Sequence, residues 1–318
     1  MSDLEMITMG RIGVDLYPQQ HDVGLAGVET FIKGLGGSPT NVAVAAARLG
    51  RRPAVVTKVG ADAFGGFCRS ALEGYGVDVS YVGVEPGLRT PLTFCEVYPP
   101  DEFPLLFYRE PTAPDIMIRA EELDLDAIRA VPLLWTTGTG LSAEPSRSAT
   151  LAALAARSPG ALTVHDLDHR PMLWADPGEH PALAREAVSH ASVVVGNREE
   201  AAVAVGGLDG TAPEQARALL ELGPELAIVK QGPRGTLAVS ADEVVEVPPV
   251  PVDVVCGLGA GDAFGGALCH ALLSGWSVER TVRFANAAGA IVAGRLLCAS
   301  AMPSADEVEA VAGAGARA

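Results

Sequence analysis

Positive charge is scarce in this sequence. Its 318 residues include 23 lysines and arginines against 39 aspartates and glutamates, which gives a formal net charge of −16. Nucleic acids and anionic membrane surfaces require a basic face, so the sequence predicts neither as a partner. The lysines are Lys33, Lys58 and Lys230. A protein of this composition that binds a phosphate or an acid must gather its few cations at one place.

Other absences narrow the class of protein further. No Gly-Lys-Ser or Gly-Lys-Thr sequence occurs, which excludes a Walker-type phosphate loop. Hydrophobic residues make up 48% of the chain. Even so, no uninterrupted apolar run reaches the roughly 18 residues that suggest a membrane-spanning helix. The N-terminus has no basic segment ahead of an apolar block, so we expect no signal peptide and a cytoplasmic protein.

Cysteines are few and scattered. None of them forms a Cys-x-x-Cys pair, which favours reduced thiols in the core over disulfides or a zinc site. The five are Cys68, Cys95, Cys256, Cys269 and Cys298.

The sequence does contain a regular alternation of apolar, strand-like runs and helical patterns. This alternation predicts an α/β fold with a doubly wound, mostly parallel sheet that helices cover on both faces. The length fits one large domain, 1–318, that carries a small appendage. The expected strands include 6–9, 54–59, 133–137, 162–166, 193–196 and 227–230. The expected helices are 40–49, 64–75, 145–157, 198–205, 213–222, 261–274 and 278–293.

Two segments interrupt the alternation, at about 15–33 and 88–110. They are rich in Thr, Val, Tyr, Phe and Pro and show no helical period, so we expect short antiparallel strands that form a small β subdomain. In open α/β sheets the ligand lies beyond the carboxyl ends of the strands. A small sheet at that edge would act as a lid over the ligand.

The richest glycine cluster in the chain, Gly257-Leu258-Gly259-Ala260-Gly261-Asp262, opens an expected helix. Small residues at a helix N-terminus let backbone N–H groups converge on an anion. An aspartate there can accept a proton from a hydroxyl beside that anion. The alternative is a tight turn in which Asp262 only caps the helix, because aspartate is a preferred N-cap.

A second cluster, Gly36-Gly37-Ser38-Pro39-Thr40-Asn41, leads into an alanine-rich helix. Bare backbone followed by an amide side chain at a helix start suits a bound ligand, although an ordinary capped helix is the better explanation of this cluster taken alone.

Taken together, the clusters resemble the paired signatures of the ribokinase-like (PfkB) family of sugar kinases. Gly36, Gly37, Asn41, Ala43, Gly50 and Gly60 match the first signature, and Gly259 through Asp262 match the second. The family's Asn-x-x-Glu corresponds to Asn197-Arg198-Glu199-Glu200, and its nucleotide loop to Lys230-Gln231-Gly232-Pro233-Arg234-Gly235. The resemblance covers nearly the whole chain, from about residue 10 to 303.

The resemblance implies ATP-dependent phosphorylation of a sugar hydroxyl, with magnesium on the phosphates. Asp262 would be the catalytic base, and the N–H groups of Gly259, Ala260 and Gly261 would form the anion hole. Glu200 would hold Mg²⁺ through water. Lids of the family often pair, which suggests a possible homodimer. The implied nucleotide-binding residues are Asn197, Lys230, Gly232, Gly235 and Asn286, and the implied sugar-binding residues are Asp15, Gly36, Gly37 and Asn41.

One departure from the family pattern lies just before the anion hole. Where the family commonly has Asp-Thr-Thr, this chain has Cys256-Gly257-Leu258. In relatives that aspartate helps to hold a monovalent cation. Because potassium prefers oxygen ligands to a thiol, we do not expect activation by potassium here.

Two arginines near the expected pocket suggest an acidic substrate, because a guanidinium grips a carboxylate with two parallel hydrogen bonds. Tyr108 and Arg109 end a lid segment, and Asp168 and Arg170 follow a core strand. The alternative is that each arginine pairs with a local acid, Arg109 with Glu110 and Arg170 with Asp168. These segments resemble those of 5-dehydro-2-deoxygluconokinases of myo-inositol breakdown. They also resemble 2-keto-3-deoxygluconate kinases, which share the Tyr-Arg and Arg-Pro-x-Leu-Trp elements.

Two other classes of protein remain to be weighed. A nicotinamide dehydrogenase would need Gly-x-Gly-x-x-Gly at the first strand-to-helix turn, and the sequence lacks it. A non-catalytic sugar or nucleotide sensor on the same fold would have no need for Asp262.

Overall fold

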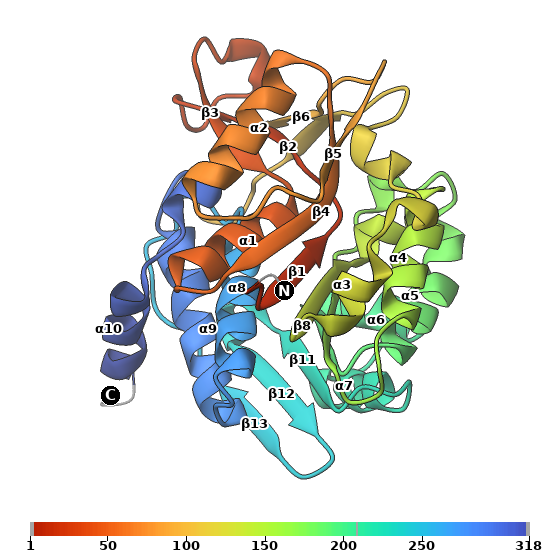
Figure 1. The fold of residues 1–318 in the computed structure, drawn as a ribbon. Coiled ribbons are helices and arrows are strands. Elements are labelled where there is room, and N and C mark those ends of the chain that lie inside the picture. The colour runs from red at the N-terminus through yellow and green to blue at the C-terminus, as the bar shows by residue number, and fades with distance from the viewer. Residues whose placement is uncertain (1–2, 208, 316–318) are drawn as a thin grey trace.

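The computed structural model describes residues 3–207 and 209–315. Its main sheet has nine strands in the order β13-β12-β11-β10-β9-β8-β1-β4-β5 (Figure 1). Only the pairings of β11 with β12 and of β12 with β13 are antiparallel, which confirms a mostly parallel sheet. The strands are β1 (Met6–Met9), β4 (Pro53–Gly60), β5 (Val82–Glu85), β8 (Leu133–Thr137), β9 (Leu162–Asp166), β10 (Val193–Asn197), β11 (Leu226–Lys230), β12 (Thr236–Ser240) and β13 (Val244–Val247).

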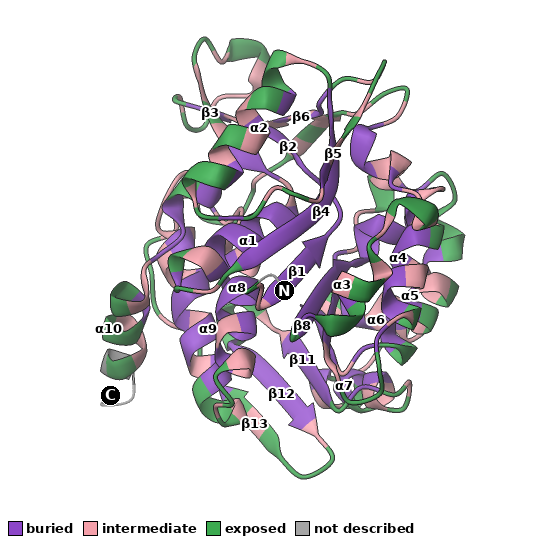
Figure 2. Ribbon diagram, viewed as in Figure 1, coloured by how far each residue is buried: buried purple, intermediate pink, exposed green. Residues whose placement is uncertain are grey.

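Helices cover both faces of this sheet, as the alternation predicts. One layer contains α1 (Ser38–Arg48), α2 (Ala63–Gly74), α8 (Ala260–Leu273), α9 (Val278–Ala293) and α10 (Ala305–Gly315). The other contains α3 (Leu125–Ala130), α4 (Ser146–Ala155), α5 (His180–Ser189), α6 (Arg198–Ala204) and α7 (Ala212–Leu220). The central strands between the layers are buried (Figure 2). Among the described residues, no helix is long and apolar enough to cross a membrane.

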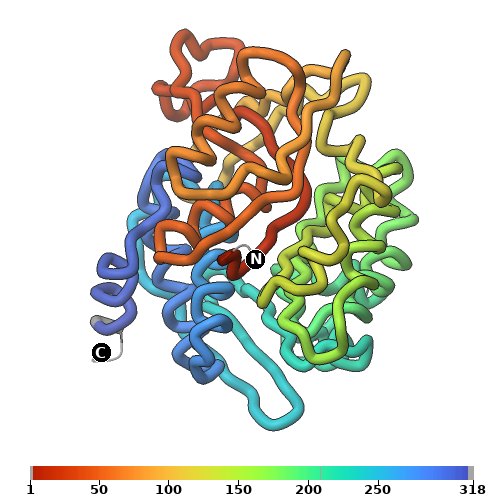
Figure 3. The backbone as a smooth tube through the Cα atoms, viewed as in Figure 1, coloured from red at the N-terminus to blue at the C-terminus, as the bar shows by residue number. Residues whose placement is uncertain are grey.

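A separate four-stranded sheet, the lid sheet, has the order β3-β2-β6-β7. Its strands are β2 (Gly13–Pro18), β3 (Phe31–Gly36), β6 (Leu92–Cys95) and β7 (Leu105–Tyr108). The tube view shows that the segment containing β2 and β3 and the segment containing β6 and β7, far apart in sequence, meet at one end of the molecule (Figure 3). The expectation of antiparallel strands is wrong for the middle pair, because β2 and β6 run parallel. The long connection between them, through β3, α1, β4, α2 and β5, allows this direction, which a tight hairpin would not.

All five cysteines are free and buried, as predicted for reduced thiols in the core.

Close packing of α8 on α1 brings two of the motifs together. A Cβ on Gly266 would lie 2.3 Å from the Cβ of Ala45, so only glycine permits this approach. The first turns of the two helices consequently lie side by side at the carboxyl edge of the sheet. There the Asn41 amide donates a 2.8 Å hydrogen bond to Asp262 Oδ2.

Candidate active site

A cavity of about 180 Å³ lies between the lid sheet and the N-terminal end of α8. We call it the lid cavity. It lies beyond the carboxyl end of the central strand β1, the position at which open α/β sheets bind ligands. Residues from both helix-opening motifs and from the lid line it, among them Arg11, Asp15, Gly37, Asn41, Phe107, Arg170, Gly259, Gly261 and Asp262.

Asp262 lies in the first turn of α8 and borders the lid cavity. It is not the helix cap, because the N-cap is Gly259 and no side chain caps this helix. Burial raises the pKa of the Asp262 carboxyl above its ordinary value, against hydrogen bonds from Asn41 and Ser38 that lower it. A carboxylate with a raised pKa, held in place by an amide, is suited to accept a proton from a bound hydroxyl.

The residues just before Asp262 form the start of α8. Gly259 has a φ of +80°, and a Cβ there would lie 2.5 Å from Cys298 Sγ, so glycine is required. Ala260 and Gly261 begin the helix, whose backbone N–H groups and dipole attract an anion. A Cβ on Gly261 would lie 3.4 Å from Lys230 Nζ, which puts an ammonium group at the same place. Burial would lower the pKa of Lys230, but the carboxylates of Asp166, Glu200 and Asp262 raise it.

Asp15, on β2, borders the lid cavity from the lid side. Its carboxyl group packs directly on Gly36, because a Cβ on Gly36 would lie only 2.1 Å from Asp15 Oδ1. The Tyr17 hydroxyl donates a 3.3 Å hydrogen bond to Asp15 Oδ2. Burial raises the pKa of Asp15 to about 6, and the nearby Arg11 opposes this shift.

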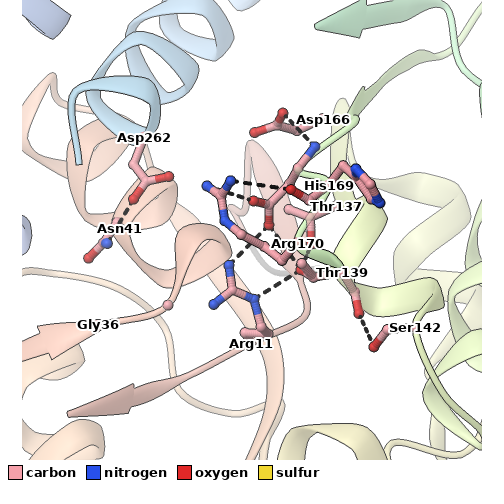
Figure 4. Close-up of polar contacts among 12 residues, drawn as sticks. Arg11, Gly36, Asn41, Thr137, Thr139, Ser142, Asp166, His169, Arg170 and Asp262 are labelled. Carbon is pink, nitrogen blue, oxygen red and sulfur yellow. Dashed lines mark hydrogen bonds and ion pairs between the residues drawn. The ribbon is translucent and has the colours of Figure 1, made fainter. Parts of the chain in front are cut away.

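Asp168 holds two arginines at the edge of the cavity (Figure 4). Its Oδ2 accepts hydrogen bonds from Arg11 Nη2 at 3.0 Å and from Thr139 Oγ1 at 2.9 Å. Its Oδ1 lies 3.1 Å from Arg170 Nη2. Asp168 itself does not line the lid cavity, whereas Arg170 does. Arg170 thus pairs with the local acid that the sequence suggested and still borders the cavity.

The structure places Tyr108 and Arg109 away from the lid cavity. Alternation along β7 directs Phe107 toward the cavity and leaves Tyr108 59% exposed on the outer face of the lid, against Phe94. Arg109 Nη2 forms a 2.6 Å ion pair with the buried Asp115 instead of the expected Glu110. Arg109 lines a second cavity, which we call the adjoining cavity and which Trp174 also lines. Arg11 lines both this cavity and the lid cavity.

The expected nucleotide residues follow strands β10 and β11. Asn197 and Glu200 form a reciprocal capping box at the start of α6, with two 2.8 Å hydrogen bonds. Glu200 Oε1 lies 3.7 Å from Arg170 Nη1. Asn286 Oδ1 accepts a 2.7 Å hydrogen bond from the Thr236 hydroxyl, and Asn286 Nδ2 donates a 3.3 Å hydrogen bond to the Pro248 carbonyl. These bonds connect α9 to the β12–β13 region. Gly232 and Gly235 flank the turn that follows β11 and both have positive φ.

Three side chains in or near the site were not predicted from the sequence. Arg11 follows β1 and Asp166 ends β9, both at the ligand-binding edge of the sheet, and that position was the available signal. Burial raises the pKa of Asp166 to about 7, against the opposing effect of Lys230. Phe107 could not be distinguished from Tyr108, because its direction depends on the register of β7.

The comparisons with known proteins agree with this geometry. Residues 4–305 match the family model described as "pfkB family carbohydrate kinase". A 5-dehydro-2-deoxygluconokinase of Halalkalibacterium halodurans is 33% identical over 313 residues, which cover 97% of this chain and 94% of that protein. One of Shouchella clausii is 31% identical over 310 residues, covering 96% and 95%.

Among solved structures, the fructokinase of Xylella fastidiosa with bound ATP superposes with a TM-score of 0.85 at 26% identity. The match covers 98% of this chain and 99% of that one. The predicted ribokinase-like fold and kinase class are thereby confirmed. The chain belongs to the pfkB family of carbohydrate kinases, and it is an ATP-dependent phosphotransferase.

Proposed function

We propose that this kinase transfers the γ-phosphoryl group of ATP to the terminal (6-) hydroxyl of 5-dehydro-2-deoxy-D-gluconate, an intermediate of myo-inositol catabolism. The names of the relatives support this choice. The observation that carries it is that Asp262 and the guanidinium of Arg170 border one cavity. A base and an anion-binding group in one pocket suit an acceptor that has a hydroxyl at one end and an acid at the other.

In the proposed mechanism, Asp262 accepts the proton of the 6-hydroxyl as its oxygen bonds to the γ-phosphorus. The bond to the bridging oxygen of ADP breaks in line with this attack. The N–H groups of Gly259, Ala260 and Gly261 stabilise the charge on the transferring group, and Lys230 adds a positive charge beside them. Because such a transition state is loose, positioning and electrostatics supply most of the rate enhancement.

Magnesium bound to the phosphates would neutralise their developing charge. The donor set fits a hard cation, because Glu200 and Asp166 offer carboxylate oxygens. Both residues are buried and lie close enough to Lys230 to raise the pKa of its ammonium group. Within 3–207 and 209–315, no cluster of three or more acids, histidines or cysteines forms a metal cage. We propose that Glu200 acts through water, with Asn197 close by. Nucleotide contacts by Gly232, Gly235 and Asn286 remain part of the proposal.

Recognition of the acceptor is proposed to divide between hydroxyl-binding and acid-binding groups. Asp15 and Asn41 would accept from and donate to the sugar hydroxyls over the bare backbone of Gly36 and Gly37. Asp168 would orient Arg170 toward the acid, and Arg109 would contribute from the adjoining cavity. Closure of the lid sheet would exclude water and so limit hydrolysis of ATP.

The runner-up acceptor is 2-keto-3-deoxygluconate, and a non-catalytic sensor is the alternative from another class. An assay for ADP release with both keto acids, and with fructose and ribose as neutral sugars, tests all of these. We expect the highest kcat/KM with 5-dehydro-2-deoxygluconate. A higher value for the other keto acid or for a neutral sugar would replace the proposed acceptor, and no ADP release with any acceptor would favour the sensor.

Pairing of two lids into a homodimer stays a prediction. The outer face of the lid carries the exposed side chains of Leu106 and Tyr108. Sedimentation velocity of the wild type and of Leu106→Glu would test the prediction.

A further inference from the structure

Arg11 is a buried arginine whose hydrogen-bonding capacity is only partly used. It lies two residues after the end of β1 and is 8% exposed. Its Nε donates to Thr139 Oγ1 at 3.0 Å and its Nη2 to Asp168 Oδ2 at 3.0 Å. In Figure 4 its third nitrogen carries no dashed line, and no hydrogen bond from Nη1 occurs among the described residues. Arg11 lines two cavities, so this unused edge is accessible to a bound ligand.

The charges around Arg11 also leave room for an acid. Asp168 is shared by Arg11 and Arg170, so one carboxylate faces two guanidinium groups. Arg170 has a second acid, Glu200, at 3.7 Å, whereas Arg11 has no second ion pair within the described part of the chain. Asp15 and Asp262 lie near enough for Arg11 to lower the pKa of each, but neither forms an ion pair with it.

The position of Arg11 matches that of an anchoring group for the acceptor. It lines the lid cavity, which contains Asp262, and also the adjoining cavity, which contains Arg109. Thr139 and Asp168 fix its guanidinium from behind, so the free edge needs no reordering when a ligand arrives.

We propose that Arg11 binds the acid group of the acceptor directly, together with Arg170, and so selects acidic over neutral acceptors. This inference rests on the proposed function, since it assumes an acidic acceptor. In this arrangement the free edge of Arg11 donates to the carboxylate of the acceptor. Asp168 holds the two guanidinium groups in place, Arg11 at Oδ2 and Arg170 at Oδ1.

A purely structural role for Arg11 makes a different prediction. If Arg11 only braces Asp168 and Thr139, its loss would disturb the site for every acceptor alike. If it binds the acid, the loss would fall on acidic acceptors. The informative quantity is therefore the ratio of kcat/KM for the keto acid to that for its neutral carboxamide.

The experiment compares wild type, Arg11→Gln, Arg11→Lys and Thr139→Val with both acceptors at saturating ATP. We expect Arg11→Gln to lower kcat/KM for the keto acid by about ten- to a hundredfold more than for the carboxamide, as loss of a charge-assisted pair implies. Arg11→Lys keeps the charge without the fork and should retain more of the preference for the acid. Thr139→Val removes a brace but keeps the guanidinium, so it should lower the preference for the acid by less than Arg11→Gln does. Thermal melts establish that each variant is folded.

Each other outcome has a definite meaning. A wild-type enzyme without any preference for the acid would refute the proposed acidic acceptor, and the role of Arg11 with it. A wild-type preference that survives in Arg11→Gln, or equal losses with both acceptors, would overturn the role of Arg11 alone. If Arg11→Gln fails to fold, Arg11→Lys decides, because an unchanged acid preference in that variant would exclude recognition by the fork.

Discussion

Two aspartates show how differently the two halves of the site are built. Asp262 lies in a stretch of four residues that also contains the anion hole, and loss of hydration raises its pKa. Asp168 is buried, but Arg170 and Arg11 hold its pKa below the ordinary value even though burial acts in the opposite direction. The first group is poised to take a proton, and the second is kept ionised to organise cations. Neighbours, not burial, decide between the two roles.

The first test of this contrast replaces the base. Asp262→Asn is nearly isosteric, so the fold and ATP binding should persist while kcat falls by about 10²–10⁴, the usual value of general-base catalysis. Steady-state ADP release, titration calorimetry with ATP and a thermal melt measure the three properties. Near wild-type turnover would refute the assignment of Asp262.

The second test replaces the organising aspartate. Asp168→Asn leaves two guanidinium groups without their shared partner, and the unfolding free energy should drop by about 3–5 kcal/mol at pH 7. Since folding lowers the pKa of Asp168, its contribution is present above the ordinary value of 3.8 and is lost as pH falls below it. Urea unfolding should therefore show a deficit that narrows on acidification. A deficit of the same size at every pH would mean that the ion pairs contribute nothing.

The third test concerns the arginines that face the acceptor. Removing Arg170 should cost about ten- to a hundredfold in kcat/KM for the keto acid, because one charge-assisted hydrogen bond is lost. The loss should be much smaller with a neutral sugar. Arg109→Ala, which removes the arginine of the adjoining cavity, is compared with the Arg170 variant in the same two assays. If neither variant changes kcat/KM for the keto acid, both arginines are merely partners of Asp168 and Asp115, and the acidic acceptor loses its main support.

The smallest expected effect concerns monovalent cations. Cys256 is buried, and burial raises the pKa of its thiol, so no thiolate is offered to a cation. Activity should differ by less than about twofold between sodium and potassium buffers of equal ionic strength, since potassium prefers oxygen ligands. A saturable activation by potassium would show that backbone carbonyls form a site without the aspartate.

Much of the fold could be predicted from local pattern. The apolar run 6–9 coincides with β1, and the segment of helical periodicity 278–293 coincides with α9. Each segment is long or apolar enough to indicate its secondary structure. The short edge strands β5 and β13 and the six-residue α3 gave no such signal. They bury too few side chains to impose a period on the sequence.

Within the site, adjacent residues are enough to specify the motifs whose geometry is local. Gly259 must adopt a positive φ and the following residues must open a helix, so the anion hole and Asp262 follow from adjacent residues. Tertiary structure alone decided which arginines face the cavity. The register of β7 places the Tyr108 side chain on the outer face of the lid, and Arg109 forms an ion pair with Asp115. Arg11 donates a hydrogen bond to Asp168, which is 157 residues away in sequence. Such contacts depend on strand register and chain crossover, and no local pattern of residues encodes those.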